Sequence, residues 1–166
     1  IYHAAAYKHV NFGQENPYSM IKNNIFGTKN IIDFSISKKV KNFTFISSDK
    51  AVNPKSILGY SKKFGEKIIQ NVKFSKFRNN TNFTIVRFGN VVNSKGSVLP
   101  MFSKQIENRL PIELTHIDVE RYFMTIPDAS KLIIEISCKK SQKTPIYFLD
   151  MDLEVFKSYF KPILLN

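Results

Sequence analysis

The sequence predicts an α/β protein built on a doubly wound parallel sheet, which carries helices on both faces. Two observations predict this fold class. Short runs of apolar, β-branched and aromatic residues alternate with longer segments of helical periodicity. The segments between the runs are long enough for the crossover connections that join parallel strands. Because ligands bind beyond the carboxyl ends of such strands, we expect the loops after Ala6, Ile46 and Phe88 to form one crevice.

The sequence of the first half of the chain predicts two strands and two helices. Residues 1–6 are small and apolar and run into polar residues, as a buried strand does where it meets a loop. A helix is expected from Asn16-Pro17, because proline is tolerated in a first turn, and its apolar spacing continues to residues 38 and 39. Residues 43–46 predict a second strand, and residues 58–75 a second helix.

The second half continues the alternation with shorter elements. Pro127-Asp128 is typical of a helix start, and Gly89-Asn90 is typical of the end of a strand. The expected elements are a strand at 83–88, a helix at 97–108, a strand at 111–114, an extended segment at 121–126, a helix at 127–136 and a strand at 146–149.

Length and composition indicate one globular domain in a reducing compartment. The chain has 166 residues, of which 43% are hydrophobic, enough for one packed core. Cys138 is the only cysteine, which excludes an internal disulfide framework or thiolate metal cluster. His3 and His116 have no partners at metal-ligand spacing, so we expect no metal. No membrane segment or signal sequence is visible, which favours a cytoplasmic protein.

The formal net charge of +12 would suit a polyanionic partner. The lysines, however, are scattered, and the chain has only four arginines, Arg78, Arg87, Arg109 and Arg121. Nucleic-acid proteins tend to cluster arginine against phosphates. We therefore expect no nucleic-acid partner. The charge remains compatible with a small anion such as the diphosphate of a nucleotide sugar.

The predicted helix at 58–75 contains a tyrosine and a lysine that look like a catalytic pair. Tyr60 and Lys62 are two residues apart and so point to opposite sides of a helix. The residue four before Lys62 is Leu58, which cannot supply a phenol acidified by an ammonium group. Gly59 is costly in a purely structural helix but suits a close approach of the backbone to a cofactor. From spacing alone, an exposed structural lysine is the favoured interpretation of Lys62.

Seven motifs together carry a resemblance to a known family. They are, in order, H-A-A-A-Y-K-H-V, N-N-x-x-G-T-x-N, S-S-D-K-A-V-N-P, L-G-Y-S-K-K, V-R-F-G-N-V, G-S-V-L-P-x-F and R-Y-F-M-T-I-P-D-A. This series closely resembles the CapD-like nucleotide-sugar 4,6-dehydratases of polysaccharide biosynthesis, which are extended short-chain dehydrogenase/reductases acting on UDP-N-acetylglucosamine. The resemblance covers residues 1–151. It implies a Rossmann-like fold and NAD or NADP as cofactor.

The resemblance also implies that part of the family's architecture lies outside this sequence. A glycine-rich turn and the first strands of the sheet should precede Ile1, so we expect an N-terminally truncated fragment that is inactive alone. Residues 1–151 would be the C-terminal part of the NAD(P)-binding domain, with substrate-binding elements at 89–126, and residues 152–166 a divergent tail. A full-length form is expected to be a homo-oligomer, at the cytoplasmic face of the membrane if it is anchored.

In that family, hydride leaves C4 of the sugar, water is eliminated across C5 and C6, and hydride returns to C6. The resemblance implies that Asp49 protonates the departing C6 hydroxyl and that Lys50 takes the C5 proton. Ser48 would hydrogen-bond the C4 hydroxyl, and Lys62 would hold the nicotinamide ribose. Leu58 occupies a position that is methionine or tyrosine in the family. Without the resemblance, a solvated loop salt pair is the favoured interpretation of Asp49 and Lys50.

Further residues are assigned to binding by the same resemblance. The cofactor would pass over Ala4, Ala5 and Ala6, for which a plain buried strand is the alternative. The substrate-binding set is Lys8, His9, Asn90, Ser97, Val98 and Arg121, of which the last four would bind the diphosphate of a UDP-sugar. Two other functions stay open: a nucleotide-sugar epimerase on the same fold, and a non-catalytic remnant or basic binding module.

Overall fold

The computed structural model describes residues 1–72, 81–92, 94, 98–112, 123–139 and 145–148. The chain forms two compact units. The first contains residues 1–88 and 133–148, and the second contains residues 89–132 and 149–166. Ser97, His116, Arg121 and the predicted tail at 152–166 lie outside the described residues.

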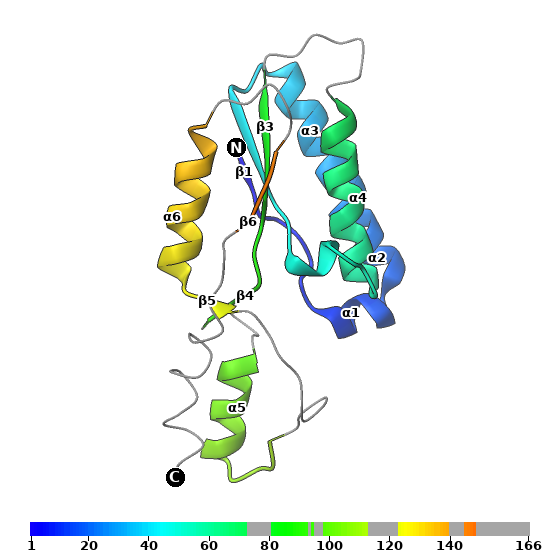
Figure 1. The fold of residues 1–166 in the computed structure, drawn as a ribbon. Helices are drawn as coiled ribbons and strands as arrows, with labels where there is room; N and C mark the ends of the chain where they lie inside the picture. The colour runs from blue at the N-terminus through cyan, green and yellow to red at the C-terminus, as the bar shows by residue number, and fades with distance from the viewer. Residues whose placement is uncertain (73–80, 93, 95–97, 113–122, 140–144, 149–166) are drawn as a thin grey trace. The chain divides into compact units, whose positions relative to one another are not determined.

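The first unit is built on a four-stranded parallel sheet, which confirms the predicted fold class (Figure 1). Its strands are β1 (Tyr2–His3), β2 (Asn42–Ile46), β3 (Asn82–Arg87) and β6 (Ile146–Phe148), hydrogen-bonded in that order. Each neighbouring pair is parallel. The carboxyl ends of β1, β2 and β3 therefore lie at the same edge of the sheet, as the crevice prediction requires.

The helices before β2 are divided more finely than predicted. Helix α1 (Val10–Glu15) was not expected, and α2 (Pro17–Ile21) begins at the predicted proline. A π-helical turn, Lys22–Phe26, then joins α2 to α3 (Gly27–Ser37). The single helix expected over 16–39 is thus interrupted by a wider turn, a feature that often occurs at functional sites.

The core lies between the sheet and the helices α3 and α4 (Ile57–Val72). Alternate residues of the paired strands point to this face, because side chains of a strand alternate between the two faces. The cluster consists of Ile32, Phe43, Phe45, Ile69, Phe83 and Ile85. Gly65 lets α4 approach the sheet, since a Cβ there would lie 2.6 Å from the Phe45 ring.

The other face of the first unit's sheet is covered by the end of α6 (Ile126–Ser137), on the side opposite α3 and α4 (Figure 1). Ile136 near the end of this helix is 3% exposed. The Tyr2 hydroxyl lies 2.9 Å from Ser137 Oγ, which ties the helix end to β1. Helices on both faces were predicted, and this arrangement confirms them.

The second unit contains a two-stranded parallel pair, β4 (Asn90–Val91) with β5 (Phe123–Met124), and helix α5 (Val98–Glu107). Strand β5 falls in the segment predicted to be extended, whereas β4 was not predicted. The strand expected at 111–114 is wrong for residues 111 and 112, which have no regular structure, and its other residues lie outside the described ones. Among the helices described, none is both long enough and apolar enough to cross a membrane.

Candidate active site

The loop after β2 gathers three predicted catalytic residues around one carboxylate. Ser48 caps a short 3₁₀ helix, Asp49–Ala51. Asp49 Oδ1 accepts hydrogen bonds from Ser48 Oγ at 2.8 Å and from the Lys50 backbone N–H at 2.8 Å. Lys50 Nζ lies 3.0 Å from the same oxygen and forms an ion pair with it. The structure therefore brings Ser48, Asp49 and Lys50 into one hydrogen-bonded cluster.

This cluster is partly exposed and anchored by its backbone. The side chains of Asp49 and Lys50 are 27% and 30% exposed. The Ser47 N–H donates to the Val86 carbonyl at 2.7 Å, and the Asp49 N–H donates to the Phe88 carbonyl at 3.1 Å, so the loop continues the pairing of β2 with β3. A fixed backbone with accessible side chains suits groups that must meet a ligand. It also matches the solvated loop salt pair that is the favoured interpretation of Asp49 and Lys50 without the resemblance.

Lys62 is buried, so its interpretation as an exposed structural lysine is wrong. The residue is 8% exposed, and its Nζ donates to the Ile46 carbonyl at 2.7 Å. Its Nζ also lies 5.0 Å from the centroid of the Phe45 ring. Burial lowers the pKa of Lys62 to about 8, and the negative charge of Glu66 opposes this shift. A buried ammonium thus lies at the end of β2, where it binds the carbonyl of Ile46, two residues before Ser48.

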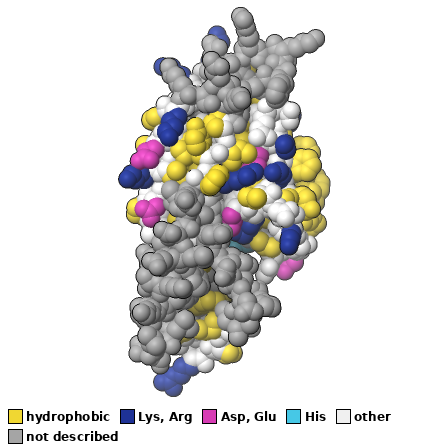
Figure 2. Space-filling view, in the orientation of Figure 1, with side chains coloured by type: hydrophobic (Ala, Val, Ile, Leu, Met, Phe, Trp, Pro, Cys, Tyr) yellow, Lys and Arg dark blue, Asp and Glu magenta, His cyan; other side chains and the backbone are white. Residues whose placement is uncertain are grey.

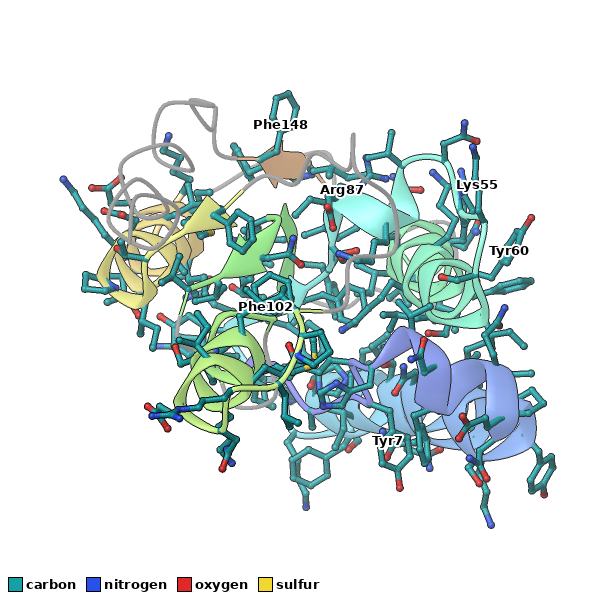
Figure 3. The ribbon with its side chains drawn as sticks, turned by 90° about the horizontal axis from the view of Figure 1, so that it is seen from below. Tyr7, Lys55, Tyr60, Arg87, Phe102 and Phe148 are labelled. Atoms are coloured by element: carbon teal, nitrogen blue, oxygen red, sulfur yellow. The ribbon has the colours of Figure 1, made fainter. Side chains whose placement is uncertain are left out.

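Tyr60 and Lys62 lie on opposite sides of α4, as helix geometry predicts. Tyr60 is 53% exposed, whereas Leu58 is 4% exposed and shares the buried side with Lys62. Figure 3 shows Tyr60 on the outer side of α4. The register that places Leu58 one turn before Lys62 therefore holds in three dimensions, and Tyr60 cannot act with Lys62.

Gly59 is required by the protein's own backbone. A Cβ at this position would lie 2.6 Å from the Lys50 carbonyl oxygen and 3.2 Å from Pro54 Cβ. The sequence led us to expect a close approach to a cofactor, but the described contact is with the loop that carries Lys50. Gly59 thus lets the candidate catalytic loop lie against the first turn of α4.

Sequence reasoning missed a buried charge cluster next to Lys62. Glu66, one helical turn after Lys62, is 1% exposed. Its Oε1 accepts from Ser47 Oγ at 2.6 Å and from Arg87 Nε at 2.7 Å, and its Oε2 accepts from an Arg87 terminal nitrogen at 2.6 Å. In Figure 3, Arg87 lies on the sheet side of α4. A lysine followed four residues later by a glutamate was the available sequence signal.

The predicted cofactor-binding alanines follow β1 and are accessible. Ala4 and Ala5 are exposed, Ala6 is half-buried, and none of them belongs to a strand. Their interpretation as a plain buried strand is therefore wrong. The Asn24 side chain holds the next segment in place by accepting from the Tyr7 N–H at 2.8 Å and donating to its carbonyl at 3.0 Å. Small side chains at an open strand end leave room for a ligand against the backbone.

The remaining predicted binding residues are placed to different degrees. Lys8 and His9 are exposed in the loop before α1, and His9 is the N-terminal cap residue of that helix. Asn90 is half-buried in β4, and Val98 begins α5. Their convergence with the first-unit residues stays a prediction, as do the roles of Ser97 and Arg121, which lie outside the described residues.

A cavity in the first unit lies away from these residues. It is lined by Ile1, Tyr2, Val40, Lys41, Asn42, Thr44, Ser137 and Cys138. Most of these residues belong to the amino-terminal ends of β1 and β2 or to the turn before β2. Candidate catalytic groups are at the carboxyl ends of the strands, so this cavity does not test the predicted crevice.

The positive charge of the described surface is dispersed. Figure 2 shows Lys and Arg side chains separated by apolar and uncharged groups on the face in view. Several basic groups are also engaged: Arg87 binds Glu66, Lys50 binds Asp49, and Lys29 binds Asp33. The expectation that the chain has no nucleic-acid partner stays a prediction.

The parallel sheet and its two helical layers define a Rossmann-like α/β fold. A solved structure, Pen from Bacillus thuringiensis, superimposes with a TM-score of 0.85 at 38% identity, covering 95% of this chain and 49% of that one. A dTDP-glucose 4,6-dehydratase from Streptomyces venezuelae with bound NAD shares the fold at 15% identity and a TM-score of 0.80, covering all of this chain and 57% of that one.

The family described as "Polysaccharide biosynthesis protein" matches residues 1–157, and the chain belongs to it. EpsC of Bacillus subtilis, a probable polysaccharide biosynthesis protein, is 48% identical over 91% of this chain and 25% of its own length. An inverting UDP-N-acetylglucosamine 4,6-dehydratase of Campylobacter jejuni is 36% identical over 81% of this chain and 40% of its own length.

A third relative bears a different activity in its name. The UDP-glucose 4-epimerase of Rickettsia canadensis is 33% identical over 81% of this chain and 39% of its own length. The chain thus spans between a quarter and two fifths of the length of these three relatives.

Proposed function

We propose that residues 1–151 form the part of an NAD(P)-dependent UDP-N-acetylglucosamine 4,6-dehydratase that carries its catalytic residues. The enzyme would act in surface polysaccharide or glycan biosynthesis. The observation that carries this proposal is the hydrogen-bonded cluster of Ser48, Asp49 and Lys50 after β2, together with buried Lys62, which donates to the Ile46 carbonyl at the end of that strand. The similarity to a relative named as such a dehydratase supports the choice of reaction. Support for the cofactor comes from the fold shared with an NAD-bound 4,6-dehydratase.

The residues at the end of β1 fit a dinucleotide. Ala4 and Ala5 are exposed and carry no bulk beyond Cβ, so a flat ring can approach the backbone there. Lys62 offers an ammonium group that is already dehydrated and held by a backbone carbonyl. A bound NAD(P) would supply the hydride transfer between C4 and C6 of the sugar. Lys62 binds the nicotinamide ribose and favours deprotonation of the C4 hydroxyl electrostatically.

In this proposal Asp49 and Lys50 supply the acid and the base of the elimination step. Neutral Lys50 removes the C5 proton, and protonated Asp49 donates to the departing C6 hydroxyl, which leaves as water. The step leaves an ammonium beside a carboxylate, which is the ion pair seen in the structure. Lys50 then returns its proton to C5 as hydride reaches C6. The proton released from the C4 hydroxyl during oxidation, passed through Ser48 Oγ to Asp49 and on to Lys50, restores the ion pair for the next cycle. Transfer of one proton from Lys50 to Asp49 across their 3.0 Å contact would form the neutral pair needed for elimination.

Substrate binding is assigned to two sets of residues in this proposal. Ser48 holds the C4 hydroxyl, while Lys8 and His9 lie at the entrance, where both are exposed. The diphosphate set is Asn90, Ser97, Val98 and Arg121. Helix N-terminal N–H groups and a guanidinium are suited to phosphate, which supports the choice of Val98 and Arg121.

The principal alternative is a nucleotide-sugar epimerase, which the similarity to a relative named UDP-glucose 4-epimerase favours. An epimerase transfers hydride at C4 but eliminates no water, so it has no need for Lys50 as a C5 base. A non-catalytic remnant or basic binding module is the second alternative, supported by the net charge of +12 and by Leu58 in the methionine or tyrosine position.

A chimaera tests the proposed function. Residues 1–151 replace the matching part of the Campylobacter jejuni dehydratase, and the product formed from UDP-N-acetylglucosamine is identified by NMR. We expect a 4-keto-6-deoxy sugar, and Lys50→Met should abolish it. A C4 epimer that persists in Lys50→Met would overturn the dehydratase in favour of the epimerase.

The binding-module alternative is tested on the isolated 166-residue chain. It is titrated separately with NADH, UDP-N-acetylglucosamine and a DNA duplex at two salt concentrations. Salt-sensitive DNA binding without nucleotide binding would overturn the enzyme proposal. We expect the isolated chain to show little or no turnover, and a homo-oligomeric full-length form stays a prediction that sedimentation analysis tests.

A further inference from the structure

The buried carboxylate of Glu66 has a set of contacts that a helix-packing role does not require. Burying a carboxylate costs several kcal/mol unless charged partners and hydrogen bonds offset the cost. Glu66 is 1% exposed and accepts three hydrogen bonds, one from Ser47 and two from Arg87. An apolar side chain of similar size would pack here without this cost. The negative charge of the Glu66 carboxylate therefore calls for a role beyond packing.

Two side chains of α4 form hydrogen bonds with two consecutive residues at the end of β2, Ile46 and Ser47. Lys62 Nζ donates to the Ile46 carbonyl at 2.7 Å, and Glu66 Oε1 accepts from Ser47 Oγ at 2.6 Å. Lys62 and Glu66 are one helical turn apart on the same side of α4. Two such bonds fix both the rotation of the helix and its height relative to the strand end. The next residue after Ser47 is Ser48, where the candidate catalytic loop begins.

Arg87 extends the same attachment to β3. Its two hydrogen bonds to Glu66 use both carboxylate oxygens, a geometry that holds the guanidinium and the carboxylate in one plane. Arg87 is the last residue of β3, and Phe88 after it accepts from the Asp49 N–H. The carboxylate of Glu66 thus reaches the end of β2 through Ser47 and the end of β3 through Arg87.

We propose that Glu66 is a positioning residue of the active site, which holds the Ser48–Lys50 loop and Lys62 in register by binding Ser47 and Arg87 at the ends of two strands. This inference rests on the proposed function, because that function is what requires the loop and Lys62 to keep a fixed position relative to each other. Glu66 itself touches neither of the candidate acid and base groups in the described contacts. Its effect is transmitted through Ser47, Arg87 and the charge it presents to Lys62.

The charges around Lys62 make the inference measurable. Glu66 faces Lys62 from the same helix, and Arg87 is paired with that carboxylate from β3. His3 faces Lys62 from β1, and both burial and the lysine charge lower the pKa of His3. From β2, Lys62 meets the Phe45 ring and the Ile46 carbonyl, which do not titrate. Glu66 is therefore the anionic partner that sustains the charged form of Lys62.

The first test measures the pKa of Lys62 by NMR in the 166-residue chain labelled with ¹³C-lysine, with Lys62→Arg identifying the signal. The wild type should titrate at about 8. Glu66→Gln should lower this pKa by roughly one unit, since an opposite charge is lost while burial remains. Glu66→Asp keeps the charge and should retain most of the wild-type value. Glu107→Gln, an exposed exchange on α5, is the matched control and should change nothing.

The direction of the shift separates positioning from packing. If Glu66 only filled space, Glu66→Gln, which keeps the volume of the side chain, would leave the pKa of Lys62 at about 8. A rise, or no change, in Glu66→Gln overturns the proposal. This measurement needs no turnover, so a failure of the proposed function, seen as a missing product in the chimaera, is recorded separately.

A second variant covers the case in which Glu66→Gln does not fold. Ser47→Ala removes one donor and leaves every charge in place. We expect the amides of Asp49 and Lys50 to exchange hydrogen about tenfold faster in this variant, because the loop loses one of its attachments. Ser37→Ala, which removes an exposed hydroxyl that donates to the Phe34 carbonyl, is the control. Unchanged exchange at Asp49 and Lys50 would overturn the proposal.

Discussion

Two ion pairs lie at the carboxyl ends of neighbouring strands, and their environments are opposite. Asp49 and Lys50 follow β2 and have side chains that are 27% and 30% exposed. Glu66 and Arg87 bridge α4 and β3, with side chains 1% and 15% exposed. The first pair is joined by one contact between adjacent residues, and the second by two hydrogen bonds across 21 residues of sequence.

The difference indicates a division of work between the two pairs. An exposed pair contributes little to stability, so its groups can change partner or protonation state at low cost. A buried pair is expensive to disturb, because a single remaining charge has no solvent to replace its partner. Groups that exchange protons with a substrate are therefore expected at the open pair, and groups that hold geometry at the buried one.

The largest effect should come from breaking the buried pair. Arg87→Ala leaves the Glu66 carboxylate buried with Ser47 as its remaining described donor, and we expect a loss of about 3–5 kcal/mol in the free energy of unfolding. Urea denaturation of the 166-residue chain measures it. Lys29→Ala removes one partner of an exposed pair and serves as the control, with an expected loss below about 1 kcal/mol. Equal losses in the two variants would contradict the comparison.

The pH dependence of stability should report the burial of Lys62. Its pKa is about 8 in the folded chain and 10.5 when exposed. Between these values the unfolded chain holds a proton that the folded chain has released, so the free energy of unfolding rises with pH. From pH 7.5 to 10 the rise amounts to about 2–3 kcal/mol.

Lys62→Met is the matched variant for this measurement, because it keeps the length of the side chain and removes the titrating group. Other groups titrate in both proteins, so the difference between the two stability curves isolates Lys62. We expect that difference to change across the window and to be flat below pH 7. A constant difference up to pH 10 would show that Lys62 stays protonated in the folded chain.

The partly exposed pair of Asp49 and Lys50 should affect turnover far more than it affects the free energy of unfolding. Asp49→Asn keeps the shape of the side chain but removes the acid, and we expect product formation by the chimaera to fall by about a hundredfold or more. The free energy of unfolding should change by less than about 1 kcal/mol, since the pair is partly exposed. Asp33→Asn, at the exposed pair on α3, is the control for turnover. Equal turnover in the two variants would remove Asp49 from the proposed mechanism.

The sequence was sufficient for the sheet and for most of its helices, because their signals are local. The runs at 43–46 and 83–88 are short and rich in aromatic and β-branched residues, and both form strands within one residue of the predicted bounds. The π-helical turn at Lys22–Phe26 was invisible, since its side chains follow nearly the same apolar spacing as an α-helix. Strand β4 was missed because two residues have no measurable period.

The candidate site was predictable only in part. Ser48, Asp49 and Lys50 are consecutive, so their meeting at a strand end follows from the chain itself. Glu66 and Arg87 were missed because their pairing depends on how α4 lies against β3, a distance of 21 residues in sequence. Lys62 was misjudged when taken alone, because spacing gives the face of a helix but not what covers that face. Burial required the tertiary structure.

The smallest effect concerns Leu58, which lies on the buried side of α4 and is 4% exposed. Leu58→Met conserves volume and should cost less than about 1.5 kcal/mol, while matching a residue that the resembling family carries here. Leu58→Tyr adds a phenol one turn before Lys62, whose ammonium would lower the pKa of that phenol. If the register is right, we expect both to raise turnover of the chimaera, Leu58→Tyr by roughly tenfold. Tyr60→Phe, on the exposed side, should leave turnover unchanged, and a loss there instead would return the catalytic role to the tyrosine that helix geometry excludes.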